Sequence, residues 1–241
     1  ILDAWRDAAE ECGIKKINEF NRGDNSGNSY FQMNQHKGSR WSATKAYLRP
    51  VISRKNLTVL THAHVKKIRI ETSNRVKVAK GVVASINKSD AKFFSAKKEV
   101  ILCAGSIGSP QILQLSGVAD KALLEKMGIP LIHELKGVGE NLHDHLQIRS
   151  VYEVQNTITL NQRINSFFGK IKMGLEYFVF KTGPLTMPPS QLGAFAKSDP
   201  SQPTANMEWH VQPLSLDKFG DPLHTFNAIT PAVCNPRPTS R

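Results

Sequence analysis

The sequence predicts an α/β fold up to about residue 150, followed by a second domain built on an antiparallel sheet. Residues 98–118 combine an apolar run, a turn of small residues and a helical pattern, which is the strand–turn–helix unit of α/β domains. After residue 150 come an amphipathic helical segment, a proline-rich loop and the alternating run MEWHVQPL, typical of a sheet strand. The 241 residues, 40% of them hydrophobic, suffice for one large or two ordinary domains.

The strand–turn–helix unit is the part of the chain that best predicts a ligand site. The run VILC at 100–103 is wholly apolar, as in a strand buried on both faces, and it stops at Ala104 and Gly105. Ser109 and the proline after it suit the start of a helix, and Gly117 suits its end. Small residues at the turn would let a ligand approach the backbone, although an ordinary tight connection explains the spacing equally well.

Further elements are predicted along the chain from periodicity and from turn and cap residues. They are a helix within 1–19, a polar loop at 21–40, a helix from Ser42 that stops before Pro50, an antiparallel meander over 65–96, a short helix capped by Asp120, a short strand at 131–135, a strand region at 146–154 and an amphipathic helix over 160–180. A polar loop as long as 21–40 is typical of a functional segment or a crossing between domains.

The formal net charge is +12, from 32 Lys and Arg against 20 Asp and Glu. The basic residues are scattered, without a long run or interleaved aromatic residues, so we expect a solvated surface and no nucleic-acid partner. A peripheral contact with acidic lipid headgroups stays open.

Cysteine usage and the chain start indicate the compartment. Cys12, Cys103 and Cys234 are odd in number and lie far apart, which favours a reducing environment. No long apolar window is present, and the first residues, ILDAWRDAAEE, lack the basic start and apolar middle of a signal peptide. We therefore expect a cytoplasmic protein, with membrane association left open.

The spacing of glycine, histidine and serine residues argues against a dinucleotide fingerprint, a metal site and a serine-hydrolase nucleophile elbow. Gly137 and Gly139 could begin a dinucleotide fingerprint, but Leu142 stands where the third glycine belongs. His143 and His145 would share a face of an extended segment, yet two histidines are too few for a metal site, and we expect none. No GxSxG elbow is present.

Three segments taken together identify a family. GSRWSATKAYLRP at 38–50, GSIGSPQILQLSGV at 105–118 and GVGENLHDH at 137–145 resemble, in their order and separation, the glucose–methanol–choline (GMC) family of flavoprotein oxidoreductases, and within it the choline-dehydrogenase-like group. The resemblance covers essentially the whole chain. Ala119 departs from the glycine that usually ends the second segment, which affects a turn position and no reacting group.

The resemblance implies an FAD-dependent alcohol dehydrogenase that passes hydride from a CH–OH group to the flavin and electrons on to a quinone-like acceptor. It implies a Rossmann-like FAD-binding domain, incomplete, over 1–150, including the linking loop 21–40 and the meander 65–96. An incomplete antiparallel-sheet α+β substrate-binding domain is implied over 151–241.

The resemblance also implies cofactor-binding residues. Val65 lies where the family's chain hydrogen-bonds the adenine, and Ala104 and Gly105 lie where the backbone passes close to the cofactor. The loop near the flavin is implied to carry Asn141, Asp144 and His145.

Two family segments are absent from this sequence: the GxGxxG near the N-terminus and the C-terminal segment with the active-site histidine. The chain is therefore interpreted as an internal fragment that carries no catalytic residue. Alone, it is expected neither to hold FAD tightly nor to turn over. Electron acceptor, covalent attachment of the flavin and oligomeric state are not predicted.

The substrate prediction rests on SQLGAF at 190–195. Family members that act on choline carry a glutamate where this chain has Gln191, and a neutral amide forfeits most of the attraction to a trimethylammonium group. We therefore expect a primary alcohol without charge, with choline as the alternative, unless Gln191 only lines a wall. A family lyase that uses FAD structurally, and a non-catalytic basic module that binds polyanions, stay open as rivals.

Overall fold

The structure is a computed structural model and describes residues 1–218 and 220–235. It contains two compact units. The first combines residues 1–51 with the described residues from 144 onward, and the second comprises residues 52–143. These units cross the predicted division at residue 150, because the first 51 residues supply a helix and an edge strand to the later sheet. Which part serves flavin and which serves substrate stays a prediction.

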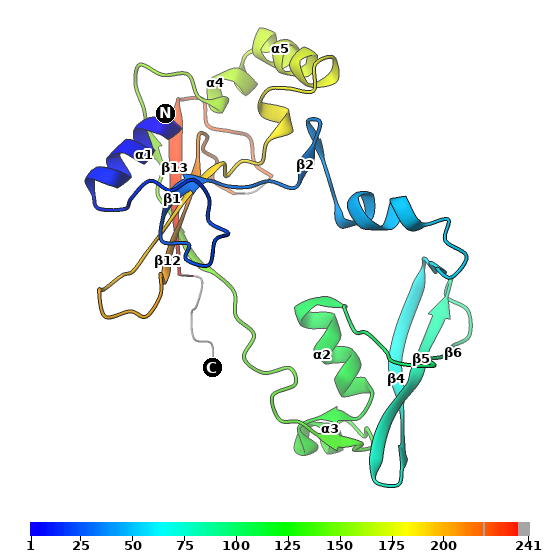
Figure 1. The fold of residues 1–241 in the computed structure, drawn as a ribbon. Helices are drawn as coiled ribbons and strands as arrows, with labels where there is room; N and C mark the ends of the chain where they lie inside the picture. The colour runs from blue at the N-terminus through cyan, green and yellow to red at the C-terminus, as the bar shows by residue number, and fades with distance from the viewer. Residues whose placement is uncertain (219, 236–241) are drawn as a thin grey trace. The chain divides into compact units, whose positions relative to one another are not determined.

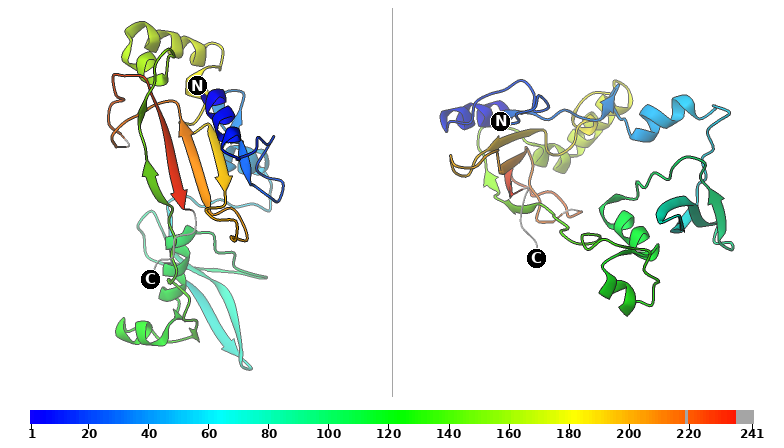
Figure 2. Two further views of the ribbon diagram at one scale, coloured as in Figure 1. Left: turned by 90° about the vertical axis from the view of Figure 1, so that its left-hand side faces the viewer. Right: turned by 60° about the horizontal axis from the view of Figure 1, so that its bottom comes forward.

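The first unit is built on a six-stranded antiparallel sheet (Figures 1 and 2). Its strands are β1 (Gly27–Tyr30), β9 (Leu146–Arg149), β10 (Tyr152–Glu153), β11 (Leu192–Ala196), β12 (Met207–Gln212) and β13 (Ala228–Asn235). The order is β1-β11-β12-β13, with β9 and β10 both paired to β13. The predicted strands at 146–154 and in MEWHVQPL are confirmed.

Strand β1 lies inside the segment predicted to be a polar loop, and that prediction is wrong. Asn28 and Ser29 are buried although they are polar. Asn28 Nδ2 donates to the Ile14 carbonyl at 2.6 Å, and Ser29 Oγ donates to the Asn18 carbonyl at 3.1 Å. Because these bonds satisfy the side chains, a strand without apolar alternation is stable at the sheet edge.

Helix α1 (Leu2–Glu11) covers one face of this sheet. Leu2 packs against Leu192, Val211 and Ile229, with Trp5 beside them. Side chains alternate along a strand, so the neighbours of these residues in β11 and β12 lie on the opposite face, which is largely polar.

The segment predicted as one amphipathic helix forms two: α4 (Leu160–Asn165) and α5 (Phe167–Phe178), followed by the short helix η3 (Pro184–Thr186). Ser166 is extended, which ends α4, and its Oγ accepts the Gly169 N–H at 3.3 Å and caps α5. Between β1 and the second unit lie β2 (Gln35–His36), β3 (Ser39–Arg40), η1 (Thr44–Leu48) and η2 (Arg49–Val51). The predicted helix at 42–49 is present, but η2 runs through Pro50.

The second unit contains the predicted antiparallel meander: β4 (Ala63–Ser73), β5 (Val76–Ile86) and β6 (Lys92–Ser95). The β4–β5 turn places Asn74 and Arg75 at positive φ, as a tight hairpin requires. The remaining elements are α2 (Gly105–Leu115), β7 (Val118–Ala119), α3 (Lys121–Lys126) and β8 (His133–Glu134). Asp120 caps α3 as predicted, since its Oδ1 accepts the Leu123 N–H.

Two predictions about the strand–turn–helix unit are wrong. The run at 100–103 is not a strand, and Ile101 is 75% exposed, because no strand among the described residues pairs with it. Helix α2 begins at Gly105, four residues before Ser109, whose Oγ instead accepts the Ala104 N–H at 3.0 Å. The predicted end is confirmed, since Gly117 follows the helix at φ +80°.

Candidate functional site

Of the predicted cofactor residues of the second unit, Ala104 and Gly105 lie at the start of α2, and Asn141 lines a cavity beside the first turns of that helix. A cavity of about 520 Å³ lies between the first turns of α2 and the loop that contains Asn141. Gly105 begins the helix at φ +81°, and no atom lies within 4 Å of the position that a Cβ would occupy there. Asn141 lines this cavity together with Ser106, the residue that follows Gly105, whereas Ala104 and Gly105 are not among its lining residues. The approach to the Gly105 backbone is open.

The walls of this cavity suit a flat, partly polar group. Ile107 and Pro110 contribute apolar surface, and Ile107 is 75% exposed. Gln114 and Asn141 contribute amides, and Gln114 Nε2 donates to the Val138 carbonyl at 3.3 Å. The first N–H groups of α2 have no acceptor within the helix and are free to bind oxygen atoms.

Val65 is not among the residues that line this cavity. It lies half-buried on β4 opposite Ala84, next to a bulge in the β4–β5 pairing. Its role beside adenine stays a prediction.

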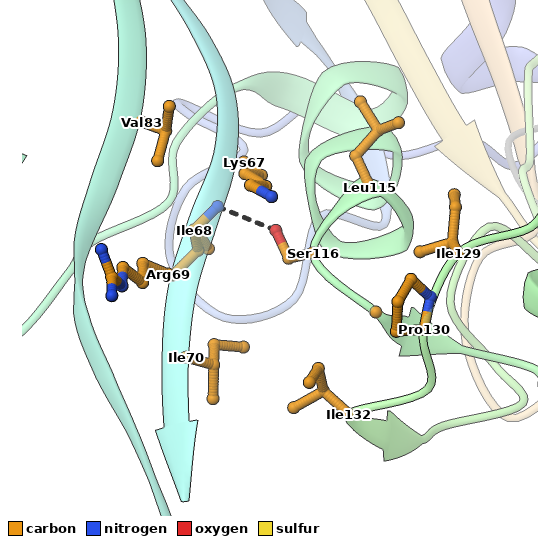
Figure 3. Close-up of a pocket in the computed structure, with 11 residues that line it drawn as sticks. Lys67, Ile68, Arg69, Ile70, Val83, Leu115, Ser116, Ile129, Pro130 and Ile132 are labelled. Atoms are coloured by element: carbon orange, nitrogen blue, oxygen red, sulfur yellow. Dashed lines mark hydrogen bonds between the residues drawn. The ribbon is translucent and has the colours of Figure 1, made fainter. Parts of the chain in front are cut away.

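A smaller cavity, of about 280 Å³, lies where β4 meets the end of α2 (Figure 3). The Ile68 N–H donates to Ser116 Oγ at 2.8 Å, which joins the strand to the helix. Ile129, Pro130 and other apolar side chains line it, with Lys67 and Arg69 from the strand. None of the predicted site residues lines it.

The first unit contains a second candidate site, on the polar face of the six-stranded sheet. Glu208 of β12 is 7% exposed. Its Oε1 lies 2.8 Å from His210 Nε2, and its Oε2 lies 3.7 Å from His145 Nδ1. A buried carboxylate is stable only with such partners, so Glu208 organises the two imidazoles around it.

The sequence singled out His145 as a residue of the loop near the flavin, a role that stays a prediction, and Glu208 and His210 were not predicted as site residues. The structure places His145 in the first unit and Asn141 in the second. Residues two apart on a strand share a face, and the alternation in MEWHVQPL could have placed Glu208 and His210 together. Nothing in the sequence joins them to His145, which comes from the segment before β9. Asp144 orders that segment, because its Oδ1 accepts the His145 N–H at 2.8 Å.

Two further polar contacts lie on the same face. Gln147 Nε2 donates to Cys234 Sγ at 3.3 Å. Burial raises the pKa of the Cys234 thiol, so the group is neutral at pH 7. Gln212 Nε2 donates to Ser190 Oγ at 2.9 Å, beside the predicted substrate residue Gln191, which directly precedes β11 and whose carbonyl accepts the Phe31 N–H.

A cavity of about 560 Å³ adjoins this face. Its walls combine apolar side chains from two segments far apart in sequence, namely Phe31, Met33, Tyr177, Leu185, Met187 and Pro188. Arg40 is its charged wall residue. The Phe31 ring joins the cavity to the polar face, since its centroid lies 5.4 Å from that of His210. Gly193 leaves room for this ring, because a Cβ there would lie 2.1 Å from it.

Comparisons with known proteins identify the family. A family model described as GMC oxidoreductase matches residues 1–147. The chain is 33% identical to an alcohol dehydrogenase (acceptor) of Pseudomonas putida, over 97% of this chain and 42% of that protein. It is also 33% identical to an oxygen-dependent choline dehydrogenase of Photobacterium profundum, over all of this chain and 41% of that protein.

Among solved structures, an FAD-dependent oxidoreductase from Chaetomium thermophilum matches with a TM-score of 0.79 at 20% identity, over 97% of this chain and 46% of that one. This likeness confirms the predicted fold, in which an α/β part is combined with an antiparallel-sheet part. The chain spans less than half the length of each of these relatives. Because the family model covers more than half of it, the chain belongs to the GMC oxidoreductase family.

Proposed function

We propose that this chain is part of an FAD-dependent enzyme that oxidises a CH–OH group. The flavin, when bound, supplies the acceptor for the hydride that leaves the alcohol carbon. Membership of the GMC oxidoreductase family supports this activity, as do the names of two relatives, an alcohol dehydrogenase and a choline dehydrogenase.

The observation that carries the proposal is the open start of α2. The free space beside Gly105 admits a flat group to the backbone, and the cavity beside it offers both apolar and amide surface. In this proposal Ile107 contacts the ring system, while the first N–H groups of α2 and the Asn141 amide hold its oxygen and nitrogen atoms.

Flavin binding tests this assignment. In the full-length polypeptide that contains these 241 residues, Ile107→Asp is expected to weaken FAD binding at least tenfold, because it places a carboxylate on the apolar surface that contacts the ring system in this proposal. Flavin absorbance after dialysis and a fluorescence titration measure the loss. Val76→Asp, an exposed apolar residue of the same unit outside the cavity, is the matched control. Equal flavin content in all three proteins would contradict the proposed site.

For the substrate we propose a primary alcohol without charge. The amide of Gln191 offers no countercharge to a cation. The one buried carboxylate nearby in the described chain, Glu208, already has two imidazole partners. The mostly apolar cavity beside Phe31 supports the same preference.

Steady-state rates on choline and on its neutral carbon isostere test the substrate proposal. We expect a higher kcat/KM on the isostere, and Gln191→Glu is expected to shift the ratio toward choline by at least tenfold, because a desolvated carboxylate attracts the trimethylammonium group. Gln162→Glu, which adds the same charge at an exposed residue of the same unit outside the cavity, is the control. A strong choline preference of the unaltered enzyme would refute the proposal.

The electron acceptor and the compartment are also proposals. We propose a quinone-like acceptor; the name of the Pseudomonas putida relative, alcohol dehydrogenase (acceptor), supports an electron acceptor without specifying its chemical class. A cytoplasmic, reducing compartment is supported by the cysteines Cys12, Cys103 and Cys234, all of which are free thiols.

A further inference from the structure

Helix α5 turns its apolar side away from the described residues of the first unit. At 3.6 residues per turn, its large exposed apolar side chains fall within one arc of about 100°, and they are Phe167, Phe168, Ile171, Leu175 and Phe178. Met173 is the residue of α5 that is buried. A helix of a globular protein normally turns its apolar stripe to the core, so the orientation of α5 is reversed.

Basic side chains border this apolar arc. Lys170 and Lys172 are exposed, and helical geometry places them on its two long sides. Lys181 follows the helix, with its ammonium group 4.5 Å from the centroid of the Tyr177 ring. Glu176 is the one acidic residue between 160 and 181. The surface is therefore both apolar and cationic.

The position of α5 leaves the arc accessible within its unit. Figures 1 and 2 show α4 and α5 beyond one end of the six-stranded sheet. The apolar surface continues past the helix, since Val179 and Phe180 are exposed as well. Among the described residues of the unit nothing buries these side chains, and a continuous exposed apolar surface of this kind is typical of an interaction site.

We propose that α5 docks on the surface of a membrane that contains anionic phospholipids. The helix lies flat, with the phenylalanine side chains among the upper acyl chains and with Lys170 and Lys172 at the phosphates. No helix of the described residues is long and apolar enough to span a bilayer, so α5 binds at the interface.

Two features favour a lipid surface over a protein partner. When the helix lies flat on a membrane with its apolar arc in the acyl region, the lysines on both edges of the arc reach the anionic headgroups on either side of the helix. The arc is also convex and rich in phenylalanine, with no polar side chain inside it to fix the register of a protein partner. This proposal does not depend on the oxidoreductase activity.

Vesicle sedimentation of the chain tests the proposal. We expect cosedimentation with vesicles of phosphatidylcholine and phosphatidylserine, and weaker binding to phosphatidylcholine alone. Phe168→Asp is expected to lower the apparent affinity at least tenfold, because it places a carboxylate within the arc. Tyr47→Asp is the matched control, since Tyr47 is 78% exposed and Phe168 is 79% exposed. Equal far-ultraviolet circular dichroism of the variants verifies their folding.

A tryptophan reporter separates insertion from simple charge attraction. In Phe168→Trp the emission is expected to shift to the blue on anionic vesicles and to be quenched by brominated acyl chains. Binding that Phe168→Asp leaves unchanged would overturn the proposal, as would a reporter that stays solvent-exposed on the vesicles. A concentration-dependent dimer dissolved by Phe168→Asp would assign the arc to a second copy instead. If the tryptophan of Phe168→Trp is already buried without lipid in the full-length polypeptide, as its blue-shifted emission would show, then another part of the protein covers the apolar arc.

Discussion

Glu208 is the residue that decides whether the polar face of the sheet offers a free carboxylate to a cationic substrate. It is the buried carboxylate on the polar face of the sheet, and both of its oxygens face imidazoles, from His145 and His210. A carboxylate so engaged has little capacity left for a cationic ligand, because its lone pairs already face the two rings. Glu208 therefore orients the two imidazoles and does not bind a cationic substrate in our proposal. The neutral Gln191 then faces the substrate without a carboxylate beside it.

Tyr30 gives the first unit a measurable pH dependence. Burial, together with the hydrogen bond from its hydroxyl to Asp3 Oδ1 at 2.7 Å, raises the pKa of Tyr30 to about 12. The unfolded chain releases this proton near pH 10, so the unfolded state binds fewer protons between about pH 10 and pH 12. The stabilisation from this group is complete below pH 10 and is lost as pH rises through 12.

We therefore expect the urea midpoint of the unaltered protein to fall relative to that of Tyr30→Phe as pH rises from about 10 to 12. Tyrosinate absorbance should show one late-titrating tyrosine that is missing in Tyr30→Phe. Tyr152→Phe, at an exposed tyrosine on the same sheet, is the control. Parallel midpoints for all three proteins across this range would contradict the assignment.

Among the elements, those with strong local patterns were predictable from sequence. The meander at 65–96 has β-prone runs separated by turn residues, and the turns at Asn74 and Asn87 indeed adopt positive φ. Asp120 caps α3 because a short acidic side chain at that position bonds the helix start directly. In these cases the deciding contacts lie within a few residues.

Elements that depend on distant partners were not predictable. The run at 100–103 has the composition of a core strand, yet a strand exists only where another strand accepts its hydrogen bonds. Strand β1 is the opposite case, since its polar side chains bond to Ile14 and Asn18 and its backbone pairs with β11. The contact between Glu208 and His145 was not predictable for the same reason, because the two residues lie 63 positions apart in sequence.

The amphipathic pattern of 160–180 was sufficient to predict a helix but not which way it faces. Periodicity places Phe167, Ile171 and Leu175 on one side, and the natural expectation is that this side packs on the core. The structure turns it outward, with Met173 as the inward contact. The direction of an apolar stripe is set by the packing of the whole unit, and our proposal that α5 docks on a membrane surface rests on this direction.

At the scale of the whole molecule, the positive charge is concentrated in the second unit. Residues 52–98 contain twelve Lys and Arg against Glu71 and Asp90, a net charge of +10 out of +12. The remainder of the chain is close to neutral, with 20 basic and 18 acidic residues. The basic residues form no run in sequence, yet β4, β5 and β6 bring many of them into one small sheet. This concentration favours non-specific attraction to polyanions at low salt.

Attraction of this kind is expected to stay non-specific. Among the described residues of the meander, Phe93 is the exposed aromatic that could stack on a base, and the guanidinium of Arg69 lies 5.2 Å from its ring centroid. Fluorescence anisotropy with a labelled oligonucleotide should give a Kd no tighter than about 10⁻⁶ M at physiological salt, with a steep decrease in affinity as salt rises. The double variant Lys80→Glu and Lys92→Glu should weaken low-salt binding more than Lys121→Glu and Lys126→Glu on α3, because counterion release depends on the local density of cations. Nanomolar affinity at physiological salt, in a natural-length protein without flavin, would instead support a polyanion-binding module.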